Sequence, residues 1–164
     1  MKQSMITPGK DDHGRFITHL NESSKAVFKV AYYLHQRGLD VNIPAIRRCK
    51  SHSEWKEYKD DGDLFISKGG KDYRIEVKAR SSDFTDGTDW RYDDFFVCAS
   101  HSYDMAEKKP YAYFILNKNR THVAIINSDT HGSWNVVKKK DRRYENMVQS
   151  FYTCPLELIK WEKI

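Results

Sequence analysis

Residues 73–80 have the sequence Tyr73-Arg74-Ile75-Glu76-Val77-Lys78-Ala79-Arg80, in which apolar or small side chains alternate with charged ones. This period of two is typical of a half-buried strand with one face on a core and the other face open. A shorter run precedes it at residues 61–66, Asp61-Gly62-Asp63-Leu64-Phe65-Ile66, and Gly69-Gly70 lies between the two runs. The glycine pair supplies the positive φ that a tight reversal needs, so the two runs predict a β-hairpin.

Three charged side chains of this hairpin are expected to converge. Glu76 and Lys78 share one strand face, with roughly 7 Å between their Cα atoms. Asp63 opens the first strand, so the hairpin can bring it beside Glu76. Two carboxylates suit Mg²⁺, which prefers oxygen ligands and often bridges to a substrate phosphate. A neighbouring lysine can hold a phosphate oxygen, or orient and deprotonate an attacking water.

Asp63, twelve further residues and then Glu76-Val77-Lys78 resemble the signature of the PD-(D/E)xK nuclease superfamily, to which many restriction enzymes and junction resolvases belong. The strand is most similar to that of the archaeal-type Holliday-junction resolvases. The resemblance covers about residues 20–80. Gly62 stands where the family usually has a proline, so one position that distinguishes this signature from other sequences does not match.

The resemblance implies an α/β, restriction-endonuclease-like fold with a central mixed β-sheet flanked by helices. It also implies a Mg²⁺-dependent DNA endonuclease, with Mn²⁺ as a possible substitute. Asp63 and Glu76 would hold the metal with the backbone carbonyl of Val77, and Lys78 would act on the attacking water. Glu22 matches an acidic residue on the first helix that often joins the family's metal site. The alternative is that Glu22 only stabilises the positive end of a helix dipole.

Composition predicts one soluble domain over residues 1–164 with a polyanionic partner. The chain has 28 Lys and Arg against 23 Asp and Glu, a net charge of +5 and a pI near 9.0. Much of this excess lies in one run, which is stronger evidence for phosphate contacts than a diffuse surplus. We therefore expect a sequence-independent DNA contact that weakens as salt rises. Its expected residues are Lys138, Lys139, Lys140, Arg142 and Arg143, together with Arg80.

Cysteine usage and hydropathy indicate a cytoplasmic, reducing environment. The three cysteines Cys49, Cys98 and Cys154 lie far apart, which signals neither a zinc cluster nor a disulfide framework. No run approaches the roughly 18 consecutive apolar residues of a membrane helix. A homodimer is expected by analogy, because symmetric cutting of two strands needs two sites, but the sequence shows no dimer seam.

Further elements are predicted from periodicity and turn signals. Residues 1–14 indicate a loose arm. The polar stretch 47–60 is either a solvated surface or a loop that contacts nucleic acid. The expected elements are a helix over 22–37 with Asn21 as N-cap and Gly38 as its stop, an edge strand over 39–46, a strand over 95–99 followed by a helix over 101–107, a hairpin over 111–116 and 121–126, a short helix over 145–149, and a packed C-terminal segment over 155–164.

Two other interpretations of the hairpin charges stay open. The chain can be a nucleic-acid-binding module without chemistry, or Asp63 can cap the hairpin while Glu76 and Lys78 are surface ion partners worth roughly 0–1 kcal/mol. The acids of residues 81–94 are expected to form turns rather than a second metal site. His122 is expected to be a packing or edge residue.

Overall fold

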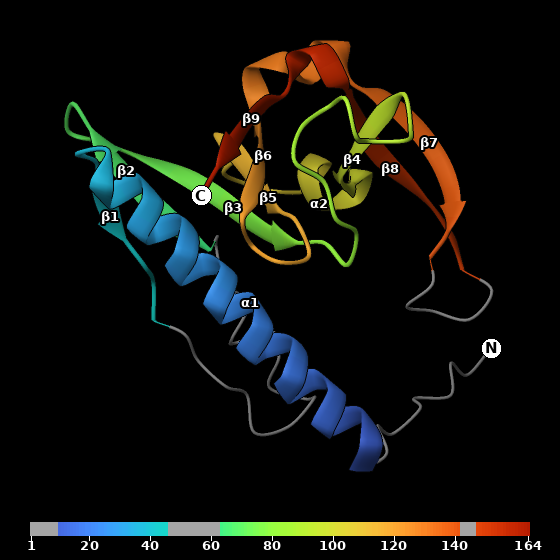
Figure 1. Cartoon of the computed structure of the whole chain (residues 1–164), viewed down its shortest axis with the longest axis horizontal. Coiled ribbons are helices and arrows are strands. Elements are labelled where there is room, and N and C mark those ends of the chain that lie inside the picture. Colours follow the sequence, from blue (N-terminus) through green and yellow to red (C-terminus); the bar gives the residue numbers. More distant parts are fainter. Residues whose placement is uncertain (1–9, 46–62, 142–146) are drawn as a thin grey trace.

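The computed structural model describes residues 10–45, 63–141 and 147–164, with side chains described from residue 22 onward (Figure 1). In this part of the chain, a six-stranded mixed sheet has the order β1-β2-β3-β5-β6-β9, and a three-stranded antiparallel sheet has the order β4-β8-β7. The elements are α1 (Lys10–Gln36), β1 (Asp40–Asn42), β2 (Leu64–Lys68), β3 (Lys71–Ala79), β4 (Asp94–Ala99), α2 (Ser100–Asp104), β5 (Ala112–Leu116), β6 (His122–Asn127), η2 (Ser128–Ser133), β7 (Asn135–Lys140), β8 (Val148–Pro155), η3 (Leu156–Leu158) and β9 (Lys160–Lys163).

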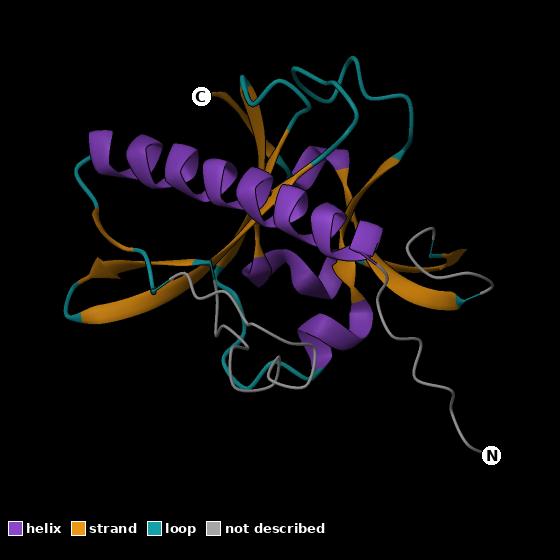
Figure 2. Cartoon of the chain, turned by 90° about the horizontal axis from the view of Figure 1, so that it is seen from below, coloured by secondary structure: helices purple, strands orange, loops and turns teal. Residues whose placement is uncertain are grey.

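The α/β class is confirmed, and the six-stranded sheet is buried on both faces by different partners. Helix α1 crosses one face (Figure 2), where Val30 and Leu34 pack against Ile75. On the other face, Ile115 packs with Phe95 of the second sheet. The expectation of helices flanking the sheet is therefore wrong for one of its faces, because the second sheet lies there with only the short helix α2.

The predicted hairpin is confirmed as β2 and β3. The strands pair antiparallel with Leu64 opposite Ile75, and a two-residue loop joins Lys68 to Lys71. Both loop glycines have positive φ, 59° at Gly69 and 74° at Gly70. This combination is the type I′ geometry, whose twist matches that of the flanking strands.

Helix α1 begins earlier than the sequence indicates. Residues 1–14 were expected to form a loose arm, but α1 begins at Lys10, so Asn21 lies inside the helix and is not its N-cap. The predicted stop is confirmed at Gly38, which has φ 78° and donates its backbone N–H to the His35 carbonyl at 2.9 Å. A glycine in the left-handed region is the usual way for a helix to end.

The remaining strand predictions have mixed outcomes. The edge strand is confirmed but shorter, as β1, and the second hairpin is confirmed as β5 and β6. The strand and helix over 95–107 are confirmed as β4 and α2, and the C-terminal segment packs on the core. The helix predicted over 145–149 is wrong for its described residues, because Val148 and Gln149 belong to β8. The loop predicted over 47–60 lies outside the described residues.

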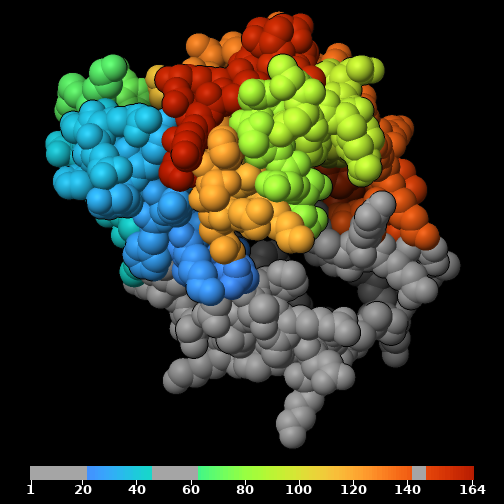
Figure 3. Space-filling model, in the orientation of Figure 1, coloured from blue at the N-terminus to red at the C-terminus, as the bar shows by residue number. Residues whose placement is uncertain are grey.

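The connection between β3 and β4 is held by one buried polar side chain. Asn117 is 1% exposed, and its amide nitrogen donates to Asp83 Oδ1 at 2.8 Å and to the Phe84 carbonyl at 2.9 Å. Phe84 in turn packs edge-on against Trp161 of β9. Figure 3 shows the yellow-green connection lying against the red C-terminal strand. A side chain from the second hairpin thus fixes a loop that lies 34 residues earlier in the chain.

The substitution Asn117→Asp should lower the free energy of unfolding by about 2–3 kcal/mol, measured by urea denaturation. It replaces a donor with a charged oxygen at the place where two acceptors, Asp83 Oδ1 and the Phe84 carbonyl, already point. The matched control is Asn119→Asp on the exposed turn of the same hairpin, where a change within about 0.5 kcal/mol is expected. Equal effects of the two substitutions would show that Asn117 does not organise the connection.

Candidate functional site

The register of the β2–β3 hairpin puts Asp63 next to Glu76. Leu64 pairs with Ile75 at the start of β2, and Asp63 is the residue just before this strand, so continuing the register by one residue would set Asp63 opposite Glu76. Directly opposite residues in an antiparallel pair project from the same face. Asp63 Oδ2 also accepts a hydrogen bond from the backbone N–H of Val77 at 2.7 Å, so the carboxylate contacts β3 just before β2 begins. The Asp63 carboxylate therefore contacts the residue that lies between Glu76 and Lys78.

Glu76 is held by Arg74, a neighbour that sequence reasoning did not include in the site. Arg74 Nε donates to Glu76 Oε1 at 3.0 Å, and Arg74 Nη2 forms an ion pair with the same oxygen. The side chains are 16% and 18% exposed, so this pair is more shielded than a surface salt bridge. Glu76 Oε2 accepts no hydrogen bond from any residue that the structure describes. The alternation of residues 73–80 already puts Arg74 on the face of Glu76, so that pattern contained the signal.

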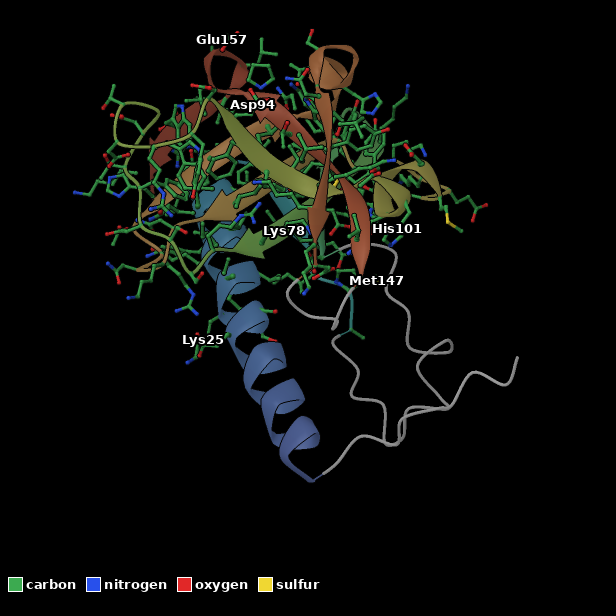
Figure 4. All side chains as sticks on the ribbon, turned by 90° about the vertical axis from the view of Figure 1, so that its right-hand side faces the viewer. Lys25, Lys78, Asp94, His101, Met147 and Glu157 are labelled. Carbon is green, nitrogen blue, oxygen red and sulfur yellow. The ribbon has the colours of Figure 1, made fainter. Side chains whose placement is uncertain are left out.

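Lys78 lies on the same face of β3, close to α1 and the second sheet (Figure 4). Its side chain is half-buried, and within the described residues its ammonium group forms no ion pair or hydrogen bond. The alternative in which Glu76 and Lys78 are ion partners is not observed, since Glu76 pairs with Arg74 instead. A half-buried lysine without a fixed partner is available to a ligand.

Lys78 lines a pocket of about 530 Å³ between β3, β4 and α1. Cys98 of β4 lies in the wall, 7% exposed. Burial raises the pKa of the Cys98 thiol; the positive charge of Lys78 acts to lower this pKa and the negative charge of Glu76 acts to raise it. Burial and the charge of Glu76 also raise the pKa of Tyr113, the residue paired with Glu76 on β5. Glu76, Lys78 and Cys98 are therefore near enough to influence one another electrostatically.

Glu22 is engaged elsewhere in this structure. Its carboxylate accepts a hydrogen bond from Lys25 at 2.9 Å and forms an ion pair with Arg120 of the β5–β6 turn. The hydrogen bonds from Lys25 and Arg120 hold the pKa of Glu22 below its usual value. Glu22 thus links α1 to the second hairpin, and the structure does not bring its carboxylate to Asp63 and Glu76. Its first-turn position is lost as well, because α1 begins at Lys10.

The basic residues expected to contact nucleic acid occupy two environments. Lys138, Lys139 and Lys140 are exposed on β7, and Lys139 lies 4.8 Å from the centre of the Phe96 ring. Arg80 is instead largely buried beside Cys98 in the pocket wall. Arg142 and Arg143 lie outside the described residues. The described basic residues therefore do not form one patch. Three lysines lie on the surface of β7, and Arg80 is buried in the pocket wall.

The acids of the β3–β4 connection form turns, as expected. Asp89 accepts hydrogen bonds from the backbone N–H groups of Thr85 and Asp86, and Asp86 accepts one from Thr88. The pKa values of both carboxyls lie below their usual range, because these donors favour the charged form. His122 was expected to be a packing or edge residue. It is half-buried on β6, where it pairs with Lys163 of β9 and its Nδ1 lies 3.0 Å from the Thr121 hydroxyl, so it does not lie at a sheet edge.

Comparisons with known proteins add no relative. A scan against protein-family models and searches of curated proteins and of solved structures gave no match. Among the residues that the structure describes, no group of three or more His, Cys, Asp or Glu side chains is arranged to hold a metal ion. Likewise, no helix in the described ranges is long and apolar enough to cross a membrane.

Alkylation of Cys98 by iodoacetamide should report the charges of Glu76 and Lys78. The thiolate is the reacting form, so the raised pKa predicts a rate that is low at pH 7 and increases well above the usual thiol pKa. Lys78→Met should raise the pKa of Cys98 further and slow alkylation at any given pH. Glu76→Gln should lower this pKa and accelerate alkylation. The rates are measured by mass spectrometry of the Cys98 peptide.

Cys154 provides the internal control, because it is fully buried on β8 and burial raises the pKa of its thiol to about 11. Its alkylation should be unaffected by either substitution. If the pH dependence of Cys98 alkylation moved in the same direction in both variants, the charges of Lys78 and Glu76 would not both act on the Cys98 thiol.

Proposed function

We propose that the chain is a metal-dependent nuclease that hydrolyses phosphodiester bonds in DNA and belongs to the PD-(D/E)xK superfamily, with a restriction-endonuclease-like fold. The observation that carries the proposal is the hairpin register, which sets Asp63 opposite Glu76 and leaves Lys78 on the same face. The sequence spacing alone allowed these residues to lie apart. The proposed chemistry requires these side chains to converge at the start of one hairpin, and the register supports this.

The oxygen atoms at this place suit a hard divalent cation. Asp63 and Glu76 are carboxylates, and the Asp63 side chain reaches the backbone of Val77, whose carbonyl is the third oxygen implied by the family resemblance. Such oxygens are the ligands that Mg²⁺ and Mn²⁺ take, with water completing the coordination. When bound, the cation would polarise the phosphate and offset charge on the leaving oxygen. Arg74 must release Glu76 Oε1, or the cation must use Oε2.

Lys78 supplies the group that acts on water or phosphate. Its ammonium has no partner among the described residues and stands two residues from Glu76 on the same face. As an ammonium it can therefore hold a phosphate oxygen or orient the attacking water. As a neutral amine, after losing its own proton, it can accept the proton of that water. Proton transfer by a positioned side chain of this kind contributes typically about 10²–10⁴-fold to a rate.

The exposed lysines of β7 fit the DNA contact of such an enzyme. Lys138, Lys139 and Lys140 lie on a two-stranded β7–β8 ribbon, and each is exposed. A β-ribbon has the dimensions to enter the major groove, and lysines along it can neutralise phosphates. A homodimer would supply the second site for symmetric double-strand cutting.

Lys78→Ala should reduce cleavage by at least about 100-fold, and Asp63→Asn should abolish it, while both variants keep DNA binding. The assay is cutting of supercoiled plasmid and of a branched junction with Mg²⁺ or Mn²⁺. The control is Asp72→Asn at the exposed turn end of β3, which changes one carboxylate away from the site and should cut at the unsubstituted rate. A well-folded unsubstituted protein that cuts neither substrate would refute the proposal.

A non-catalytic nucleic-acid-binding module is the second candidate function. The Arg74–Glu76 ion pair favours it, because a carboxylate that already has a cationic partner needs no metal to be stable. In this case the hairpin charges would serve the fold, and only the β7 lysines would contact nucleic acid.

Calorimetric titration with Mg²⁺ separates the two candidates through Arg74. Arg74→Gln removes a positive charge from Glu76, so a nuclease site should bind Mg²⁺ at least about threefold more tightly than in the unsubstituted protein. Arg91→Gln on the exposed β3–β4 connection is the control with the same change in charge and should leave affinity unchanged. Absence of Mg²⁺ uptake in both the unsubstituted protein and Arg74→Gln would favour the binding module.

A further inference from the structure

The pocket beside Lys78 contains a buried arginine that has no acidic partner among the described residues. Arg80 donates one hydrogen bond, from Nη2 to the Phe96 carbonyl, while its buried Nε has no hydrogen-bond partner. Burial lowers the pKa of Arg80, the direction expected when a cation is removed from water. Burying a charge without a counter-ion costs free energy. A ligand with a negative charge would offset this cost for the Arg80 guanidinium. Lys78, which forms no ion pair with a described residue either, adds a second positive charge to the lining of the pocket.

Two aromatic residues also line this pocket. Phe96 of β4 and Phe151 of β8 both line it, and their ring centroids lie 5.6 Å apart in an edge-on arrangement. Asp141, which follows β7 and is 5% exposed, adds one acidic group to the lining. Among the described residues, the pocket thus combines Lys78 and Arg80, from β3 and the residue after it, with two aromatic side chains of the three-stranded sheet and the carboxylate of Asp141.

We propose that this pocket receives one unpaired nucleotide of the DNA substrate, with its phosphate on Lys78 and Arg80 and its base against Phe96 and Phe151. A volume of about 530 Å³ lies within the range of small-molecule sites. Base–aromatic stacking is tolerant of sequence, so the pocket would select an unpaired base rather than a particular base. The negative charge of Asp141, whose Oδ2 accepts a hydrogen bond from Gln149, disfavours the phosphate on the aromatic side, which gives the nucleotide one orientation.

The inference rests on the proposed function for its ligand, because a nuclease that acts at Lys78 must place a phosphate there. It goes further by naming the substrate class. DNA with an unpaired nucleotide, such as a bulge, gap or branch, is preferred to fully paired duplex. The cost of extruding a base is lowest when that base is already unpaired.

The test measures DNA binding in EDTA, so that neither metal uptake nor cutting is required. Fluorescence anisotropy compares a duplex carrying a one-nucleotide bulge with the fully paired duplex of the same sequence. We expect the bulged DNA to bind about tenfold more tightly or better. Phe151→Leu should reduce this preference to within about twofold, with binding of the paired duplex unchanged. Arg80→Gln should reduce the preference to the same extent. Tyr32→Leu, on the exposed outer face of α1, is the aromatic control and should keep the preference.

A second measurement places the nucleotide in the pocket. Bulged DNA should slow alkylation of Cys98 by iodoacetamide more than paired DNA does, because Cys98 lies in the pocket wall. A free nucleoside monophosphate should compete with the bulge, and inorganic phosphate at the same concentration should compete much less. Thermal unfolding verifies that the Phe151 and Arg80 variants are folded. If either variant is unfolded, the protection of Cys98 by bulged DNA in the unsubstituted protein tests the proposal instead.

Equal binding of bulged and paired DNA would overturn the inference, as would competition by phosphate equal to that of the nucleotide, which would indicate an anion site only. These outcomes differ from failure of the proposed function. A protein that cuts DNA without preferring the bulge keeps the nuclease proposal and loses the nucleotide pocket. A protein that prefers the bulge but never cuts keeps the pocket and loses the nuclease.

Discussion

The candidate site depends on the register of the β2–β3 hairpin, and the two-residue turn sets that register. A slip of one residue would turn every side chain of a strand to the other face. It would place Asp63 opposite a core position and separate it from Glu76. Gly69 and Gly70 prevent this, because both adopt positive φ and so fix a loop of two residues between Lys68 and Lys71. Two residues without side chains therefore determine where the acidic groups meet.

The hairpins could be predicted from the sequence because their signals are local. The β2–β3 alternation and the glycine turn lie within a short window, as does the Gly38 stop of α1. The start of α1 could not be predicted, because Gly14 and Asn21 are poor helix formers that cost only about 1 kcal/mol or less each. Adding residues to the N-terminal end of an existing helix is cooperative, and the hydrogen bonds gained outweigh these costs. Strand β8 was missed for a different reason, since its pairing partners are distant in the sequence.

The candidate site was predictable in the same uneven way. The alternation of residues 73–80 correctly predicted that Glu76 and Lys78 share one face. It also puts Arg74 on that face, but the ion pair between Arg74 and Glu76 was not predicted. The burial of Arg80 could not be predicted, because it requires Phe96 from β4 to cover it. The aromatic lining requires β8 as well. A pocket formed where two sheets meet has no signature within either sheet alone.

The parallel pairing of β3 with β5 has a consequence for the order in which the molecule folds. Ile75 pairs with Ala112, so a long crossover must close before this ladder forms, whereas the β2–β3 hairpin closes across two residues. Contacts between residues far apart in sequence slow folding, because loop entropy is lost before they form. On a ribosome, the hairpin carboxylates can therefore meet while β8 is still unsynthesised. An emerging chain would carry this hairpin long before the pocket between the two sheets could form.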